Sequence, residues 1–304
     1  MQTTAPGRDG MLLFALTPPR QSTSPERAAQ IADATLARLE QVSPDAVLLY
    51  DITDEADRTD EERPFPFLPT MDPGVYWERH FDDCRFPVVV YRAVGHHAEP
   101  VLRDWLGRQD ASRVRTVFVG GSSSDRAMAT TLPRAYELLR EVNPDLPLGG
   151  VAIPERHTSK RSEHHKLLRK QQAGCSFFVT QIVYDVNAAK NMVSDYRVAC
   201  AEAGVQMVPV VFTFSVAGSL KTLEFMRWLG VEVPHWIEND MASAADPLAI
   251  SLRHALGAVN DIVGYCRLMG IPFGINVESV SSRKVEIDAA VELAGQVDAL
   301  LREG

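Results

Sequence analysis

The run FFVTQIVY, Phe177–Tyr184, is apolar at almost every position and is followed at once by Asp185. A strand with one face in water alternates apolar and polar residues, whereas a strand covered on both faces is a nearly continuous apolar run. Helices packed on both faces of a parallel sheet provide that cover. This stretch therefore predicts a strand of a parallel sheet in an α/β protein.

Similar runs recur along the whole chain and alternate with amphipathic, helix-like segments. The other runs are Met11–Thr17, Ala46–Thr53, Phe86–Val94, Val114–Val119, Leu148–Ile153, Met207–Phe214 and Phe273–Val277. The helical segments include Pro25–Gln41, Arg126–Val142, Ser162–Gln172, Ala188–Ala203, Ser219–Leu229, Asp246–Met269 and Arg283–Leu301. Eight strand–helix units in 304 residues predict a (β/α)₈ TIM barrel, with a doubly wound open sheet as the alternative. We expect one domain over residues 1–304, with residues 1–10 as a short N-terminal tail.

Composition narrows the possible partners. Forty acidic and 31 basic residues leave a net charge of −9, which argues against nucleic acid and anionic membranes as partners. No signal-peptide core and no apolar run of about 18 residues is present. The four cysteines have no CxxC spacing, which favours buried, reduced thiols. We therefore expect a cytoplasmic protein that binds small molecules.

Two stretches after predicted strands are candidate binding segments. Gly120, Gly121 and Ser122 follow the strand Val114–Val119, and glycines before a helix let backbone N–H groups approach an anion. The alternative is a plain capped turn. The irregular stretch Asp54–Gly74 holds six acidic residues up to Glu62 and then four prolines. A barrel would place it at the C-terminal face, where active sites form, although a solvated loop has the same composition.

Histidine and lysine clusters give weaker signals. The adjacent pairs His96-His97 and His164-His165 point in different directions on a helix, so we expect no metal site. The segment Lys160–Lys170 is the most basic part of this acidic chain. It is either a solvated helix face or a site for a phosphate or a polyacidic tail.

Four segments together resemble the methylenetetrahydrofolate reductase family, whose members are (β/α)₈ barrels. Ala173–Asp185 is similar to that family's AGA-x-F-x-ITQ-x-x-FD signature, and Phe14–Arg20 to its FEFFPPR first strand. Gly150–His157 resembles its GVAxYPExH segment, and Val208–Trp236 contains matches to its seventh strand and the helix start beyond it. The resemblance spans nearly the whole chain and is weakest in residues 54–85 and after residue 270.

The departures from the family pattern fall where the family holds flavin and supplies its general acid. Ala15 stands at the position of the family's first-strand glutamate. Val88 aligns with a histidine beside the flavin, and Val119-Gly120-Gly121 replaces an Arg-Gly-Asp segment. These differences imply that FAD is absent.

The folate side of the pattern is better kept. Gln181 matches the glutamine that hydrogen-bonds the folate ring, and Tyr184 could stack on the pterin or p-aminobenzoate ring. Asp185 is expected to cap the next helix rather than touch ligand. Glu155 and Glu278, at the ends of the fifth and eighth strands, could hold the pterin amino group.

The resemblance therefore implies reduction of 5,10-methylenetetrahydrofolate to 5-methyltetrahydrofolate by direct hydride transfer from NADH or NADPH. Glu55 is the first candidate for the missing acid, followed by Asp51 and Asp54. The residues assigned to the nicotinamide cofactor are Thr17, Gly120, Gly121, Ser122 and Lys160. The alternatives are an FAD-dependent methylenetetrahydrofolate reductase, a folate-binding homologue without catalysis, and another one-carbon transfer enzyme on the same barrel.

Overall fold

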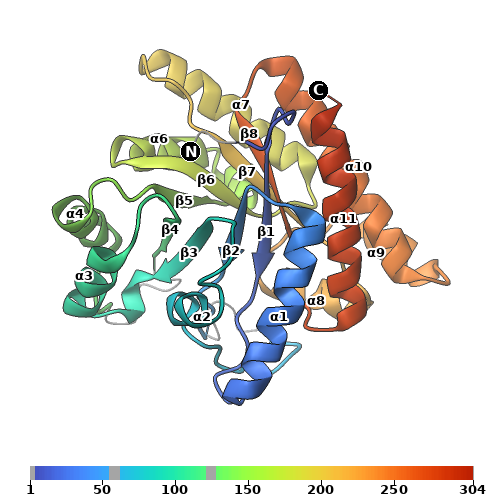
Figure 1. The fold of residues 1–304 in the computed structure, drawn as a ribbon. Helices are drawn as coiled ribbons and strands as arrows, with labels where there is room; N and C mark the ends of the chain where they lie inside the picture. The colour runs from blue at the N-terminus through green and yellow to red at the C-terminus, as the bar shows by residue number, and fades with distance from the viewer. Residues whose placement is uncertain (1–3, 55–61, 121–127, 304) are drawn as a thin grey trace.

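The computed structural model describes residues 4–54, 62–120 and 128–303. Eight parallel strands close into one barrel in chain order, with helices around it (Figure 1). The strands are β1 (Met11–Leu16), β2 (Ala46–Leu49), β3 (Val88–Ala93), β4 (Val114–Val119), β5 (Leu148–Ala152), β6 (Cys175–Ile182), β7 (Val210–Ser215) and β8 (Phe273–Glu278). The predicted (β/α)₈ barrel is confirmed.

Helices follow each strand and cover its outer face. Those before β5 are α1 (Pro25–Val42), α2 (Pro73–His80), α3 (Glu99–Arg108) and α4 (Leu132–Val142), with the short 3₁₀ turn η2 (Val94–His96). Those after β5 are α5 (Pro154–Lys160), α6 (Glu163–Gln172), α7 (Val186–Glu202), α8 (Leu220–Trp228), α9 (His235–Ser243), α10 (Pro247–Met269) and α11 (Lys284–Arg302). None of the helices in the described ranges is both long and apolar enough to cross a membrane.

Strand side chains alternate between the barrel interior and the helix layer. In β6, Phe177 and Val179 belong to the interior cluster, whereas Phe178 packs in the larger cluster beneath the helices. The interior is filled to contact: a Cβ on Gly149 would stand 2.5 Å from the ring of Phe177. The barrel is therefore a packed core, and its polar groups can gather only at its ends.

Local signals in the sequence set several helix starts. Ser24 accepts a hydrogen bond from the backbone N–H of Arg27, with Pro25 in the first turn, and Asp185 caps α7 through the N–H groups of Asn187 and Ala188. Both caps were predicted. The four cysteines are buried and unbridged, as expected.

Two predicted boundaries are clearly wrong. Strand β2 ends at Leu49 instead of Thr53, because the chain beyond it leaves the ladder. Helix α4 begins at Leu132, capped by Thr131, and residues 128–131 before it are not helical, although the helix was predicted from Arg126. The predicted helix Ser162–Gln172 is confirmed as α6, but the short helix α5 before it, which ends where Arg161 adopts a left-handed conformation (φ 44°), was not predicted.

The N-terminal tail is fastened to the barrel. The guanidinium of Arg8 is fully buried, with its Nε 2.5 Å from Asp298 and its Nη1 3.2 Å from Asp45. Asp45 also accepts from the backbone N–H of Leu12, the second residue of β1. Arg8 therefore joins the starts of β1 and β2 to α11.

We expect Arg8→Met to lower the free energy of unfolding by about 3–5 kcal/mol, because it leaves the buried carboxylate of Asp45 without its cation. The matched control is Arg302→Met, which removes an exposed partner of the same Asp298 and should cost no more than about 1 kcal/mol. Urea unfolding measures both values. Equal effects of the two substitutions would contradict the assignment.

Candidate functional site

Polar side chains meet inside the C-terminal end of the barrel, contributed by non-adjacent stretches of sequence. The Tyr50 hydroxyl donates a short hydrogen bond to Glu278 and accepts one from Asn276 (3.2 Å). Asn276 also bonds Thr213 (3.2 Å), and the ring of Tyr91 packs edge-on against Tyr50 with 5.0 Å between centroids. These residues occupy inward positions on β3, β7 and β8 and just past the end of β2.

Glu278 is the one carboxylate among the inward-facing positions of the described strands. It is only 6% exposed, and burial raises its pKa to about 7, although the Tyr50 hydrogen bond acts in the opposite direction. Burial and the neighbouring Glu278 charge raise the pKa of Tyr50 well above its ordinary value, so the phenol keeps its proton. Glu278 can therefore hold or release a proton near neutral pH.

Strand register places Glu278 beside Ala15. The two residues are Cα partners across the β1–β8 ladder, and Glu278 is likewise paired with Ser215 on β7. The small methyl group of Ala15 leaves the carboxylate next to it without a bulky neighbour on β1. The first strand thus has Ala15 where the resembled family has a glutamate, and the adjacent position on the eighth strand is a glutamate, Glu278.

The segment that follows residue 61 runs past this carboxyl end. Thr70 forms an antiparallel bridge with Arg20 after β1, and the backbone N–H of Gln21 donates to Pro69. At its other end, Phe65 packs edge-on against Phe225 of α8. This segment therefore connects the chain after β1 to the helix after β7, the two strands that flank β8.

Asp51 lies just beyond the end of β2. Its Oδ2 accepts from the backbone N–H of Ala93 (2.9 Å) and lies 3.1 Å from Nε2 of His97. Both partners belong to the end of β3 or the turn after it. Asp51 therefore ties the carboxyl ends of β2 and β3 together, and its oxygen is already engaged there.

The residues predicted to bind substrate occur at the ends of β5 and β6. The side chain of Gln181 donates to the carbonyl of Leu229 (3.2 Å) and accepts from the N–H of Ile182 (3.1 Å). Glu155 is half-buried, and burial raises its pKa to about 7, with the negative charges of Glu232 and Asp185 adding to the effect. Gln181 and Glu155 thus both face the loop between α8 and α9.

Tyr184 is packed rather than open. It is 8% exposed and belongs to a cluster with Leu223 and Met226 of α8 and Ile237 of α9. Stacking of its ring on a ligand would require that cluster to separate.

The described residues assigned to a cofactor come from separate elements. Thr17 and Gly120 are exposed, just beyond β1 and β4, and Lys160 is exposed at the end of α5. Glu55, Gly121 and Ser122 lie outside the described residues. Lys166 and Lys170 of the basic segment are already engaged, by Glu163 (2.8 Å) and by the carbonyl of Val151.

One aligned position proves uninformative. Val88 is the first residue of β3, fully buried, and it packs in the outer cluster under the helices. A side chain at the opposite end of the strand cannot touch a ligand at the mouth. Ala15 and the end of β4 are therefore the two departures from the family pattern that bear on flavin binding.

Sequence reasoning missed Tyr50, Tyr91 and Asn276 as members of the site. Their signal was available in the period of two: Tyr50 continues the inward series Ala46 and Leu48. Every second residue of a barrel strand points inward. When these residues are apolar along the strand and a polar one follows at its carboxyl end, that polar residue lies at the mouth of the barrel.

We expect the burial of Glu278 to appear as pH-dependent stability. Its pKa rises from 4.5 to about 7 on folding, so between these values the native state binds more protons than the unfolded chain. Stability must then fall as the pH rises through this window, by up to about 3 kcal/mol. Glu278→Gln removes this contribution.

Urea unfolding of both proteins between pH 4.5 and pH 8 measures the effect. The difference in unfolding free energy, Glu278→Gln minus unsubstituted protein, should grow with pH. Parallel curves would show that Glu278 titrates as an exposed carboxyl does.

The fold and this site define a (β/α)₈-barrel protein with a buried, titratable carboxylate at the mouth. The methylenetetrahydrofolate reductase family model matches residues 124–263. A solved Clostridium thermocellum protein, described as binding two copies of 5-methyl-5,6,7,8-tetrahydrofolic acid, is 37% identical; the match covers 96% of each chain with a TM-score of 0.84. The chain belongs to the methylenetetrahydrofolate reductase family.

More distant matches share the fold alone. Xylanase 10C of Cellvibrio japonicus is 13% identical, with a TM-score of 0.55 over 97% of this chain and 71% of that one. Xylanase XynB of Paenibacillus barcinonensis is 11% identical, with a TM-score of 0.53 over 90% of this chain and 85% of that one. Among curated proteins, none matches this sequence significantly.

Proposed function

We propose that this protein reduces 5,10-methylenetetrahydrofolate to 5-methyltetrahydrofolate, with NADH or NADPH as the direct hydride donor. The family membership and the folate bound by the Clostridium thermocellum relative support a reduced folate as ligand. The observation that carries the chemistry is Glu278, a buried carboxyl with a pKa near 7 beside Ala15.

The reaction needs one proton and one hydride. Protonation of N10 opens the five-membered ring between N5 and N10 and leaves a methylene iminium on N5. Hydride from C4 of the reduced nicotinamide then adds to the methylene carbon and gives the N5-methyl group. One folate, one reduced nicotinamide and one proton become 5-methyltetrahydrofolate and the oxidised nicotinamide, so atoms and charge balance.

Glu278 suits the role of proton donor. A general acid works best when its pKa lies near the working pH, and burial places that of Glu278 at about 7. Tyr50 fixes the direction of the carboxyl through its hydrogen bond. Glu55, the candidate chosen from sequence, lies outside the described residues and is the competing assignment.

Two features argue against a resident flavin. FAD that stays bound needs a firm site for its pyrophosphate, and the β4 end offers Val119 where the family has a cation. Helix α4 begins at Leu132, so its N-terminal N–H groups are not presented directly after Gly120. We therefore derive no step through a flavin.

A nicotinamide nucleotide that leaves after each turnover needs weaker binding than a resident cofactor. We assign its contacts to Thr17 and Gly120 at the mouth and to Lys160, an exposed cation at the end of α5. Gly121 and Ser122 complete the assignment from sequence. Gln181 and Glu155 hold the pterin. The edge of the pterin ring both donates and accepts hydrogen bonds, and the amide of Gln181 and the carboxyl of Glu155 can pair with it.

We expect Glu278→Gln to lower the turnover of reduced nicotinamide with methylenetetrahydrofolate by about 10²- to 10⁴-fold, with little change in KM for the folate. Turnover of the unsubstituted protein should decrease as the pH rises through about 7, because the carboxyl loses the proton that it must donate. Steady-state kinetics test both statements.

Glu55→Gln is the matched comparison, since it makes the same change on the competing candidate. It should leave turnover unchanged. If Glu55→Gln abolishes turnover and Glu278→Gln does not, the acid is Glu55.

We expect Gln181→Ala to raise the Kd for 5-methyltetrahydrofolate about fivefold, because a ring hydrogen bond contributes roughly 1 kcal/mol. The control is Gln296→Ala on α11, whose side chain donates a hydrogen bond to Glu292 on the same helix. Isothermal titration calorimetry measures both constants.

The titration, together with an assay of nicotinamide oxidation, separates the second candidate function. A folate-binding homologue without catalysis binds 5-methyltetrahydrofolate yet oxidises no nicotinamide when methylenetetrahydrofolate is added. An unchanged Kd for Gln181→Ala would remove Gln181 from the folate site under either function.

A further inference from the structure

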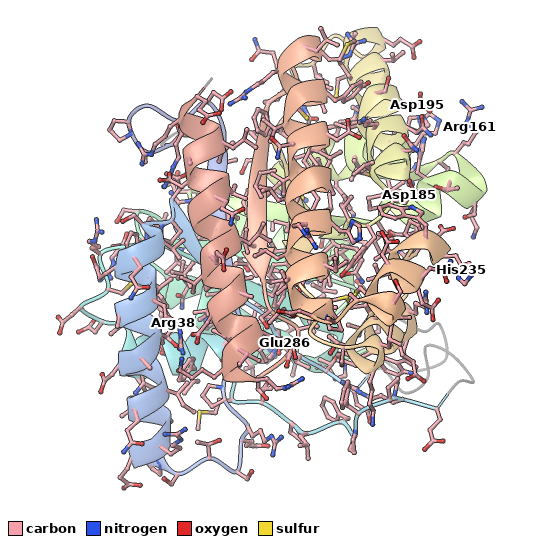
Figure 2. All side chains as sticks on the ribbon, turned by 90° about the vertical axis from the view of Figure 1, so that its right-hand side faces the viewer. Arg38, Arg161, Asp185, Asp195, His235 and Glu286 are labelled. Atoms are coloured by element: carbon pink, nitrogen blue, oxygen red, sulfur yellow. The ribbon has the colours of Figure 1, made fainter. Side chains whose placement is uncertain are left out.

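A second group of chemically capable residues lies outside the barrel, among α5, α6 and α7. One ring nitrogen each from His157 and His164 and a carboxylate oxygen of Asp195 lie within 4.8 Å of one another. Helix α5 carries His157, and the left-handed Arg161 turns the chain so that the first turn of α6 brings His164 back onto it. Figure 2 shows Asp195 further along α7 than its N-cap Asp185, away from the mouth.

The distances suit a tetrahedral cation. Zinc binds histidine nitrogen and carboxylate oxygen at about 2.0–2.2 Å, which places tetrahedral ligands about 3.3 Å apart. Nε2 of His157 lies 3.2 Å from Oδ2 of Asp195. The rings of His157 and His164 are nearly perpendicular, with an interplanar angle of 74° and 5.2 Å between their centroids.

The two histidines differ in their partners. Nε2 of His157, a residue only 2% exposed, already faces Asp195, whereas Nδ1 of His164 is buried with no hydrogen-bond partner among the described residues. A buried polar atom without a partner costs free energy. A cation that accepts the lone pair of His164 Nδ1 would recover that cost.

The three residues are open to water on one side. Asp195 is 36% exposed in its side chain, so water can reach the group and fill a fourth position.

We propose that His157, His164 and Asp195 form a binding site for a divalent transition metal, with Zn²⁺ as the ion that fits best. Two nitrogens and one carboxylate oxygen are the donors that zinc accepts, and a water supplies the fourth ligand. The site clamps α5 and α6 to α7. Because α5 begins directly after β5, the clamp also holds the helix that carries Glu155.

The test uses the full chain, stripped with a chelator and titrated with ZnCl₂ in calorimetry and in thermal unfolding. We expect one Zn²⁺ per chain and a higher Tm in its presence. His164→Gln and Asp195→Asn should each weaken Zn²⁺ binding at least tenfold and abolish the Tm increase. Both residues are partly exposed, and circular dichroism confirms that each variant folds.

The matched control is His254→Gln. Nε2 of His254 lies 3.1 Å from Asp240, and among the described residues no second histidine joins this histidine–carboxylate pair in a three-residue cluster. It should leave the Zn²⁺ affinity unchanged, as should His165→Gln. The proposal is overturned if the stripped protein binds no Zn²⁺, or if His164→Gln and Asp195→Asn bind it as tightly as the unsubstituted chain. No folate or nicotinamide is present, so the outcome is independent of the proposed reduction.

Discussion

Closure of the barrel through the β1–β8 ladder is the constraint on which the rest of the structure depends. Eight strands buried on both faces have no free edge, so β1 must pair with β8. That pairing places Ala15 and Glu278, from opposite ends of the sequence, at the same level of the mouth. A packed apolar interior beneath them then forces the polar network of Tyr50, Asn276 and Thr213 to the C-terminal end.

Burial of a single carboxyl inside this closed wall sets the chemistry. No cation lies beside Glu278 on the neighbouring strands β1 and β7. Burial therefore favours the protonated form of Glu278 more than water favours that of an exposed glutamate. The hydrogen bond from Tyr50 stabilises the ionised form of Glu278 and lowers its pKa in part. The resulting pKa is about 7, so the carboxyl can ionise near neutral pH. The cost in stability and the capacity to donate a proton are thus two consequences of one location.

Much of this followed from the sequence. Continuous apolar runs predicted the eight strands, and Ser24 and Asp185 predicted helix starts, because these signals are local. The register between β1 and β8 is a long-range property, so the neighbour of Ala15 was not visible, and Glu278 was assigned to substrate binding. The short helix α5 was also missed, because only the helix from Ser162 onward was predicted, and the left-handed conformation of Arg161 that ends α5 has no sequence signature. Without α5, His157 and His164 appeared unrelated.

The most direct test of the account follows the hydrogen itself. Reduced nicotinamide carrying deuterium at both C4 positions is incubated with the protein and methylenetetrahydrofolate in ordinary water, and the product is analysed by mass spectrometry and NMR. Direct transfer predicts one deuterium in the N5-methyl group of every product molecule. A methyl group without deuterium would show that the hydride passes through an exchangeable carrier, and the absence of 5-methyltetrahydrofolate would show a protein that binds folate without reducing it.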